Sequence, residues 1–94
     1  MTVERREGDS KGEFVAYENG SIAGKMTFSN AGSRTFIIDH TEVNPEFSGK
    51  GVGKEMVMAA VAYARENGKE IIPLCPFALS VFNKDSSLSD VRSM

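Results

Sequence analysis

The feature that most constrains the fold is a change of pattern in the second half of the chain. Residues 35–43 (TFIIDHTEV) are rich in β-branched and aromatic side chains, which is typical of a strand. Residues 52–67 then combine good helix formers with no proline, which predicts a helix that ends at Gly68. Residues 70–74 (EIIPL) read as a second, short strand. A strand, a helix and a strand in succession require a parallel pair of strands joined by a right-handed crossover.

The first half of the chain predicts an antiparallel meander. Residues 13–18 and 21–29 are strand-like, and Asn19-Gly20 between them is the strongest short hairpin signal in the sequence. With residues 35–43 as its third strand, the meander precedes the β-α-β unit. We expect an α+β fold: a three-strand meander, the β-α-β unit and a short C-terminal helix over residues 77–85.

Length and composition limit the function classes. The 94 residues are expected to form one domain, with residues 1–12 and 86–94 as flexible ends. Eleven basic against thirteen acidic residues, with no basic tract, argue against nucleic acid and anionic membranes as partners. One cysteine cannot form an internal disulfide, and the first residues lack the apolar core of a signal peptide. We therefore expect a cytoplasmic protein that is a monomer or a weak dimer.

Three alternating glycines stand where the strand gives way to the helix. Gly49, Gly51 and Gly53 would expose successive backbone amides at a helix N-terminus, where the helix dipole favours a phosphate. The alternative is that these glycines only make a tight turn, and both interpretations stay open on position alone. The spacing fits neither a Walker loop nor a dinucleotide fingerprint.

A third pattern fits the same residues. Val43-x-Pro45 followed by Ser48-Gly49-x-Gly51-x-Gly53 resembles the acetyl-CoA-binding motif of the GNAT superfamily of acetyltransferases. That motif is usually written R/Q-x-x-G-x-G/A after a V-x-P strand end. The resemblance covers about residues 35–85, and the chain is similar to the short, stand-alone members of the superfamily.

The resemblance implies acetyl-CoA as cosubstrate and no metal. It implies that the loop amides hold the CoA pyrophosphate, and that the preceding strand offers backbone to the pantetheine at Glu42 and Val43. It also implies that the following parallel strand splays away, so that the cofactor lies between the two strands. The cofactor-binding residues implied are Val43, Ser48, Gly49, Lys50, Gly51, Val52, Gly53 and Lys54.

Two departures from the family pattern bear on activity. Ser48 replaces the usual Arg or Gln at the start of the motif. The usual N-x-x-A-x-x-x-Y segment is Cys75-x-x-Ala78-x-x-x-Phe82 here, and phenylalanine cannot donate a proton to a departing thiolate. Both departures favour a non-catalytic CoA-binding or interaction module as the alternative to an N-acetyltransferase. A phosphate-binding domain with no CoA preference is a third possibility.

Three residues are candidates for catalysis. Strict strand alternation places His40 and Glu42 on one face with Ile38, and either side chain could deprotonate an incoming ammonium. Cys75 stands at the end of the second parallel strand, where a thiol could accept the acetyl group if His40 lies within hydrogen-bond reach. The alternatives are an ordinary polar sheet face for His40 and Glu42 and a small buried hydrophobe for Cys75. The expected acceptor is an unidentified amine.

Overall fold

A five-stranded sheet with its strands in the order β1-β2-β3-β4-β5 forms one layer of the computed structural model, which describes residues 1–93. The strands are β1 (Thr2–Glu7), β2 (Lys11–Glu18), β3 (Ser21–Asn30), β4 (Thr35–Val43) and β5 (Glu70–Pro73). The helices are α1 (Val52–Asn67) and α2 (Pro76–Lys84), with 3-10 helices η1 (Pro45–Phe47) and η2 (Ser86–Val91).

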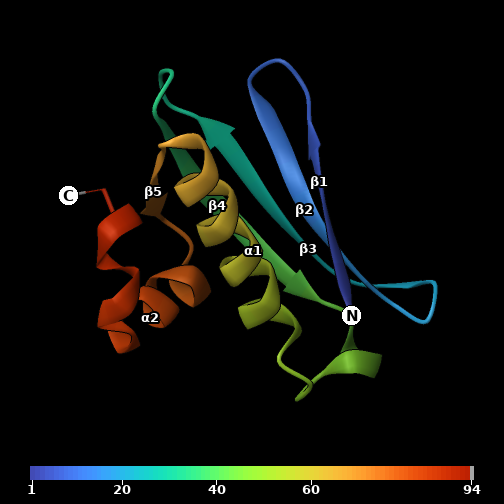
Figure 1. Cartoon of the computed structure of the whole chain (residues 1–94). Helices are drawn as coiled ribbons and strands as arrows, with labels where there is room; N and C mark the ends of the chain where they lie inside the picture. The colour runs from blue at the N-terminus through green and yellow to red at the C-terminus, as the bar shows by residue number, and fades with distance from the viewer. Residues whose placement is uncertain (94) are drawn as a thin grey trace.

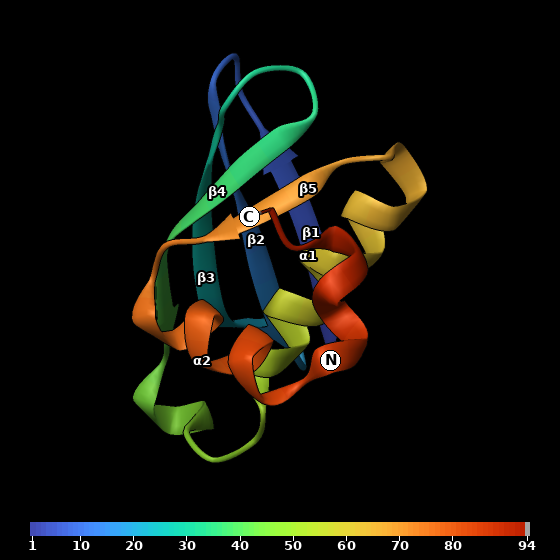
Figure 2. The ribbon, with the colours of Figure 1, turned by 90° about the vertical axis from the view of Figure 1, so that its left-hand side faces the viewer.

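The topology confirms the predicted fold class. Strands β1 to β4 form antiparallel neighbours, whereas β5 runs parallel to β4 after the α1 crossover. Both α-helices lie on the same face of the sheet, and no α-helix of residues 1–93 lies on the opposite face (Figures 1 and 2). Pro73 lies in the edge strand β5, as expected for a residue that cannot donate to a central ladder. None of the helices within residues 1–93 is long and apolar enough to cross a membrane.

The two chain ends differ from the prediction of flexible termini. Residues Thr2–Glu7 form the edge strand β1, so the meander has four strands rather than three. Near the other end, η2 buries Leu88 and Val91 against the core, and the Ser93 amide donates to the Ile71 carbonyl of β5 (2.8 Å). Met94 lies outside the described residues.

Local signals account for the element boundaries that the sequence predicted. Asn19 and Gly20 both have positive φ (52° and 80°), which matches the twist of a tight hairpin. Helix α1 ends at Gly68, whose left-handed conformation (φ 63°) lets its amide donate to the Ala64 carbonyl.

The core lies between the sheet and the helices. Its centre is aromatic: the Phe28 ring lies 5.4 Å from both the Phe14 and the Phe36 ring centroids. Tyr63 of α1 packs edge-on against Phe14 and Phe36. This packing holds α1 across β2, β3 and β4, and therefore fixes where the loop before α1 meets the end of β4.

Candidate active site

Strand β4 contains a bulge that changes which side chains share a face. Phe28 pairs with Ile38 and Thr27 with His40, so Asp39 is an extra residue in the ladder. Beyond the bulge, Thr41 contacts Cys75 and Val43 lines a cleft beside α1, both on the helix side of the sheet.

His40 and Glu42 alternate with Thr41 and Val43, and therefore point to the open face of the sheet, away from Ile38. The prediction that Ile38, His40 and Glu42 share one face is wrong. Strict alternation fails at Asp39, because the bulge shifts it by one residue.

The pairing of β4 with β5 ends at Ile38, the residue before the bulge. The parallel ladder runs from Thr35 to Ile38 on β4, with Ile38 opposite Pro73. The Cys75 amide then donates to the Ile38 carbonyl (3.0 Å), and the chain turns into α2. Among the strands of residues 1–93, the rest of β4, up to Val43, pairs only with β3, so one edge of its backbone has no strand partner there. This is the separation of the two parallel strands that the family resemblance implied.

The three alternating glycines have two different structural causes. Gly49 and Gly51 have positive φ (79° and 76°), and a Cβ on either would meet no heavy atom within 4 Å. A Cβ on Gly53, in contrast, would lie 2.6 Å from the Phe77 ring. The first two glycines thus provide a left-handed turn beside open space. The third lets the aromatic ring of α2 pack directly on α1.

The first turn of α1 has free backbone donors. Gly51 is its N-cap residue and provides no side-chain hydrogen bond. The first helical bond joins the Glu55 amide to the Gly51 carbonyl (3.0 Å), so the amides of residues 52–54 have no acceptor within the helix. Free amides at the positive end of a helix dipole attract an anion such as a phosphate group.

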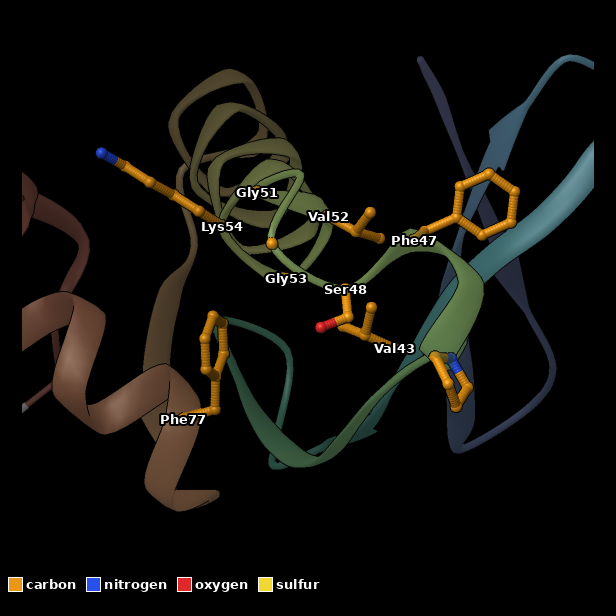
Figure 3. A pocket seen from close by; sticks show the side chains of 10 residues that line it. Val43, Phe47, Ser48, Gly51, Val52, Gly53, Lys54 and Phe77 are labelled. Atoms are coloured by element: carbon orange, nitrogen blue, oxygen red, sulfur yellow. The ribbon is translucent and has the colours of Figure 1, made fainter.

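These amides border the cleft between β4, the loop and α2. The cleft has a volume of about 630 Å³, within the range of small-molecule sites. Its lining residues are Val43, Pro45, Phe47, Ser48, Gly49, Gly51, Val52, Gly53, Lys54 and Phe77. In Figure 3, Ser48 and Val43 lie between the Phe77 ring on one side and the Phe47 ring on the other. An open turn, free amides and a lysine fit the pyrophosphate of CoA.

Seven of the eight residues predicted to bind the cofactor line this cleft. The exception is Lys50, whose ammonium lies over the Phe47 ring, 5.5 Å from its centroid. Pro45, Phe47 and Phe77 also line the cleft and are not among the predicted residues. Phe77 is 41% exposed although its ring packs on Gly53. The sequence feature that could have indicated Phe77 is Gly53, because a glycine on the packed face of a helix indicates a bulky neighbour from another element.

The two candidate base residues form a pair. His40 Nε2 and Glu42 Oε1 lie 3.3 Å apart, and both side chains are largely exposed (65% and 72%). They stand on the open face beside the unpaired edge of β4. A carboxylate that orients an imidazole can pass a proton between water and an incoming amine.

Cys75 has different neighbours. Its side chain is buried (4% exposed), and its sulfur accepts a hydrogen bond from the Ala78 amide (3.3 Å) as the N-cap of α2. Its other polar contact is Thr41 Oγ1, at 3.2 Å. Since His40 is paired with Glu42 on the opposite face, the structure does not bring His40 to the thiol. Phe82 is buried in the core, away from any role in proton transfer.

Comparison with known proteins identifies the class. The family model described as GCN5-related N-acetyl-transferase matches residues 13–91. The chain therefore belongs to the GCN5-related N-acetyltransferase (GNAT) family, whose members use acetyl-CoA. A search of curated proteins found no match.

Solved structures agree with the fold. The chain is 36% identical to a GCN5-like protein from Staphylococcus aureus, over 96% of this chain and 87% of that one, with a TM-score of 0.69. Ribosomal-protein-alanine N-acetyltransferase from Brucella melitensis is 20% identical over 82% of this chain, with a TM-score of 0.67, and this chain spans 62% of its length. An aminoglycoside N-acetyltransferase in complex with CoA is 19% identical over 82% of this chain and 67% of that one, with a TM-score of 0.57. The last two matches support the fold alone.

Proposed function

We propose that this protein binds acetyl-CoA in the cleft between β4, the glycine loop and α2, and transfers the acetyl group directly to a primary amine. The observation that carries the proposal is the uncapped first turn of α1, which opens into the cleft beside an unpaired strand edge. When bound, acetyl-CoA would supply a thioester: its acyl carbon forms a bond to the amine nitrogen, and its carbon–sulfur bond breaks to release CoA as a thiolate, which takes up a proton from water.

The chain's own residues would orient the cofactor. The amides of residues 52–54 donate to the pyrophosphate, and Lys54 adds a positive charge at the same place. Phe77 and Val43 form apolar walls on either side of the cleft. The unpaired edge of β4 between the bulge and Val43 offers backbone donors and acceptors to the pantetheine amides, as an added strand would do.

The acceptor would approach from the open face. The helices cover one face of the sheet, so an amine reaches the end of the unpaired β4 edge from the other face, where His40 and Glu42 lie. An ammonium group must lose a proton before its nitrogen can attack. We assign this step to Glu42, with His40 as its hydrogen-bond partner. Ser48 makes no charged contact in the loop, so affinity depends mainly on backbone donors.

Acetylation of Cys75 is the second candidate route, because Cys75 follows the point where β4 and β5 separate. Direct transfer is favoured instead, because the Cys75 thiol is buried and accepts a hydrogen bond from the Ala78 amide, and because His40 lies on the opposite face of the sheet. A non-catalytic CoA-binding module is the alternative if acetyl-CoA binds and no amine is acetylated.

The site is tested by calorimetric titration, which compares the CoA affinity of the natural protein with that of the Gly51→Glu variant. The substitution places a carboxylate where the phosphates should lie, and we expect CoA affinity to fall at least about 100-fold. Gly32→Glu is the matched control, because Gly32 also has a positive φ (83°) and open space at its Cβ, in the turn before β4. Both variants share the backbone strain, so their Tm values should match. Equal CoA affinity in the two variants would overturn the cleft assignment.

A further inference from the structure

The open face of the sheet carries an apolar strip at the point where β4 and β5 separate. Ile37 and Ile72 are partners in the parallel ladder, and both are half-buried. The residue before each of them is buried in the core (Phe36 and Ile71), so alternation turns both isoleucines to the face away from α1 and α2. Leu74 follows at the end of β5 and is 64% exposed. We call Ile37, Ile72 and Leu74 the apolar strip.

Acidic side chains lie beside the apolar strip on β4. Leu74 follows the last pair of the parallel ladder, so it lies level with the bulge at Asp39. The Asp39 carboxylate accepts a hydrogen bond from the Ser29 hydroxyl (2.6 Å), and Ser29 shares the open face with its ladder partner on β4. Glu42 follows with its partner His40 on the same face. An uncharged strip therefore borders carboxylates that attract a cation.

The proposed binding of acetyl-CoA brings the thioester to this end of β4. The pyrophosphate lies on the first turn of α1, beside Val43, and the pantetheine runs back along the unpaired edge of β4 toward the bulge. The thioester end is then where β4 and β5 separate, close to Leu74. An amine whose nitrogen reaches the thioester from the open face has the rest of its structure over the apolar strip.

We propose that the apolar strip binds the carbon chain of the acceptor, and that the acceptor is a hydrophobic primary monoamine. Its nitrogen meets the His40–Glu42 pair, and its chain lies over the strip. Methylene groups in this position leave water and gain free energy, whereas a second ammonium group would lose hydration and gain no partner there. This inference rests on the proposed function, because the position of the thioester is what places the chain over the strip.

The experiment measures kcat/KM for the acetylation of straight-chain amines from propylamine to hexylamine. We expect kcat/KM to rise about twofold with each methylene, about half of the fourfold effect of complete burial. Hexamethylenediamine has the chain of hexylamine with a second ammonium at the far end. We expect its kcat/KM to be about tenfold below that of hexylamine.

Leu74→Asn tests the strip directly. The ratio of kcat/KM between hexylamine and propylamine should fall from about eightfold to about threefold or less, and the value for propylamine should stay nearly unchanged. Ile22→Asn is the matched control. Ile22 is also an exposed aliphatic residue (43%), but it lies beyond the pair Gly24–Val43, at the other end of the unpaired half of β4. This variant should retain the ratio.

Binding can also be measured without turnover, by titration of hexylamine into the CoA-bound protein followed by methyl NMR. The largest shifts should fall on the methyl groups of Ile37, Ile72 and Leu74, and shifts confined to other methyl groups would overturn the inference. Values of kcat/KM that do not depend on chain length, or that match for hexylamine and hexamethylenediamine, would overturn it and leave acetyl transfer intact. Equal loss of the ratio in both variants would also overturn it. If no amine is acetylated, the proposed transfer itself fails, and the inference fails with it.

Discussion

The two halves of strand β4 belong to one continuous element and have opposite roles. The first half, up to Ile38, is paired on both sides and buries Phe36 and Ile38 (1% and 0% exposed). In the part of the chain that the structure describes, the second half, up to Val43, is paired on one side only, and four of its five side chains are exposed. The bulge at Asp39 and the departure of β5 coincide at the boundary. One continuous strand thus supplies both the centre of the core and an edge where a ligand can add hydrogen bonds.

The largest expected difference between the two halves is in stability. Ile38→Ala leaves a cavity among the core side chains, and we expect it to lower the free energy of unfolding by about 2–5 kcal/mol. Val43→Ala, on the same side of the same strand, should cost no more than about 1 kcal/mol because Val43 is 36% exposed. Urea denaturation followed by circular dichroism measures both. Equal losses would mean that the second half of β4 is also core.

Glu42→Gln tests the second half as a catalytic edge. With direct transfer and Glu42 as base, kcat/KM should fall about 100-fold near neutral pH, while CoA affinity and Tm stay unchanged. The loss should narrow at high pH, where the amine deprotonates without help. The rate is measured from the release of the CoA thiol. The acceptor is the primary amine that reacts fastest in a panel.

Glu66→Gln, an exposed carboxylate near the end of α1, is the control for the loss of one negative charge. If Glu42→Gln lowers kcat/KM equally at all pH values, Glu42 contributes to binding or structure and is not the base.

The smallest expected effect is that of Cys75→Ser. Because the thiol is buried and His40 lies on the other face, we expect the rate of amine acetylation to change less than about threefold, within the range of a modest packing change. Intact-protein mass spectrometry after incubation with acetyl-CoA should show no acetyl adduct that hydroxylamine removes. A hydroxylamine-labile adduct that disappears in Cys75→Ser, with turnover lost, would establish the covalent route instead.

Sequence patterns predicted those parts of the fold that local chemistry determines. The strand Thr35–Val43 and the helix Val52–Asn67 have the predicted bounds, since β-branched residues, a proline break and Gly68 each act within a few residues. The glycine loop was placed correctly at the start of α1 for the same reason.

Features that depend on distant contacts were missed. Strand β1 is highly charged and lies in the segment predicted to be a flexible end, yet Arg5 places its guanidinium over the Tyr63 ring of α1, 4.1 Å from the centroid. Charged residues are common in edge strands, but the local sequence does not indicate that Arg5 packs on Tyr63 of α1. The bulge at Asp39 likewise has no local signal, because it results from the register between β3 and β4. That one residue decided which face His40 and Glu42 occupy.

The most direct test of this account is a titration of ¹⁵N-labelled protein with CoA, followed amide by amide by NMR. We predict that the largest shifts fall on the residues of β4 beyond the bulge and on residues 49–54, and that the amides of residues 35–38 change little. Such a result would locate the cofactor on the unpaired half of β4 and at the start of α1. Saturating CoA that leaves both segments unshifted, or that shifts both halves of β4 alike, would contradict the account.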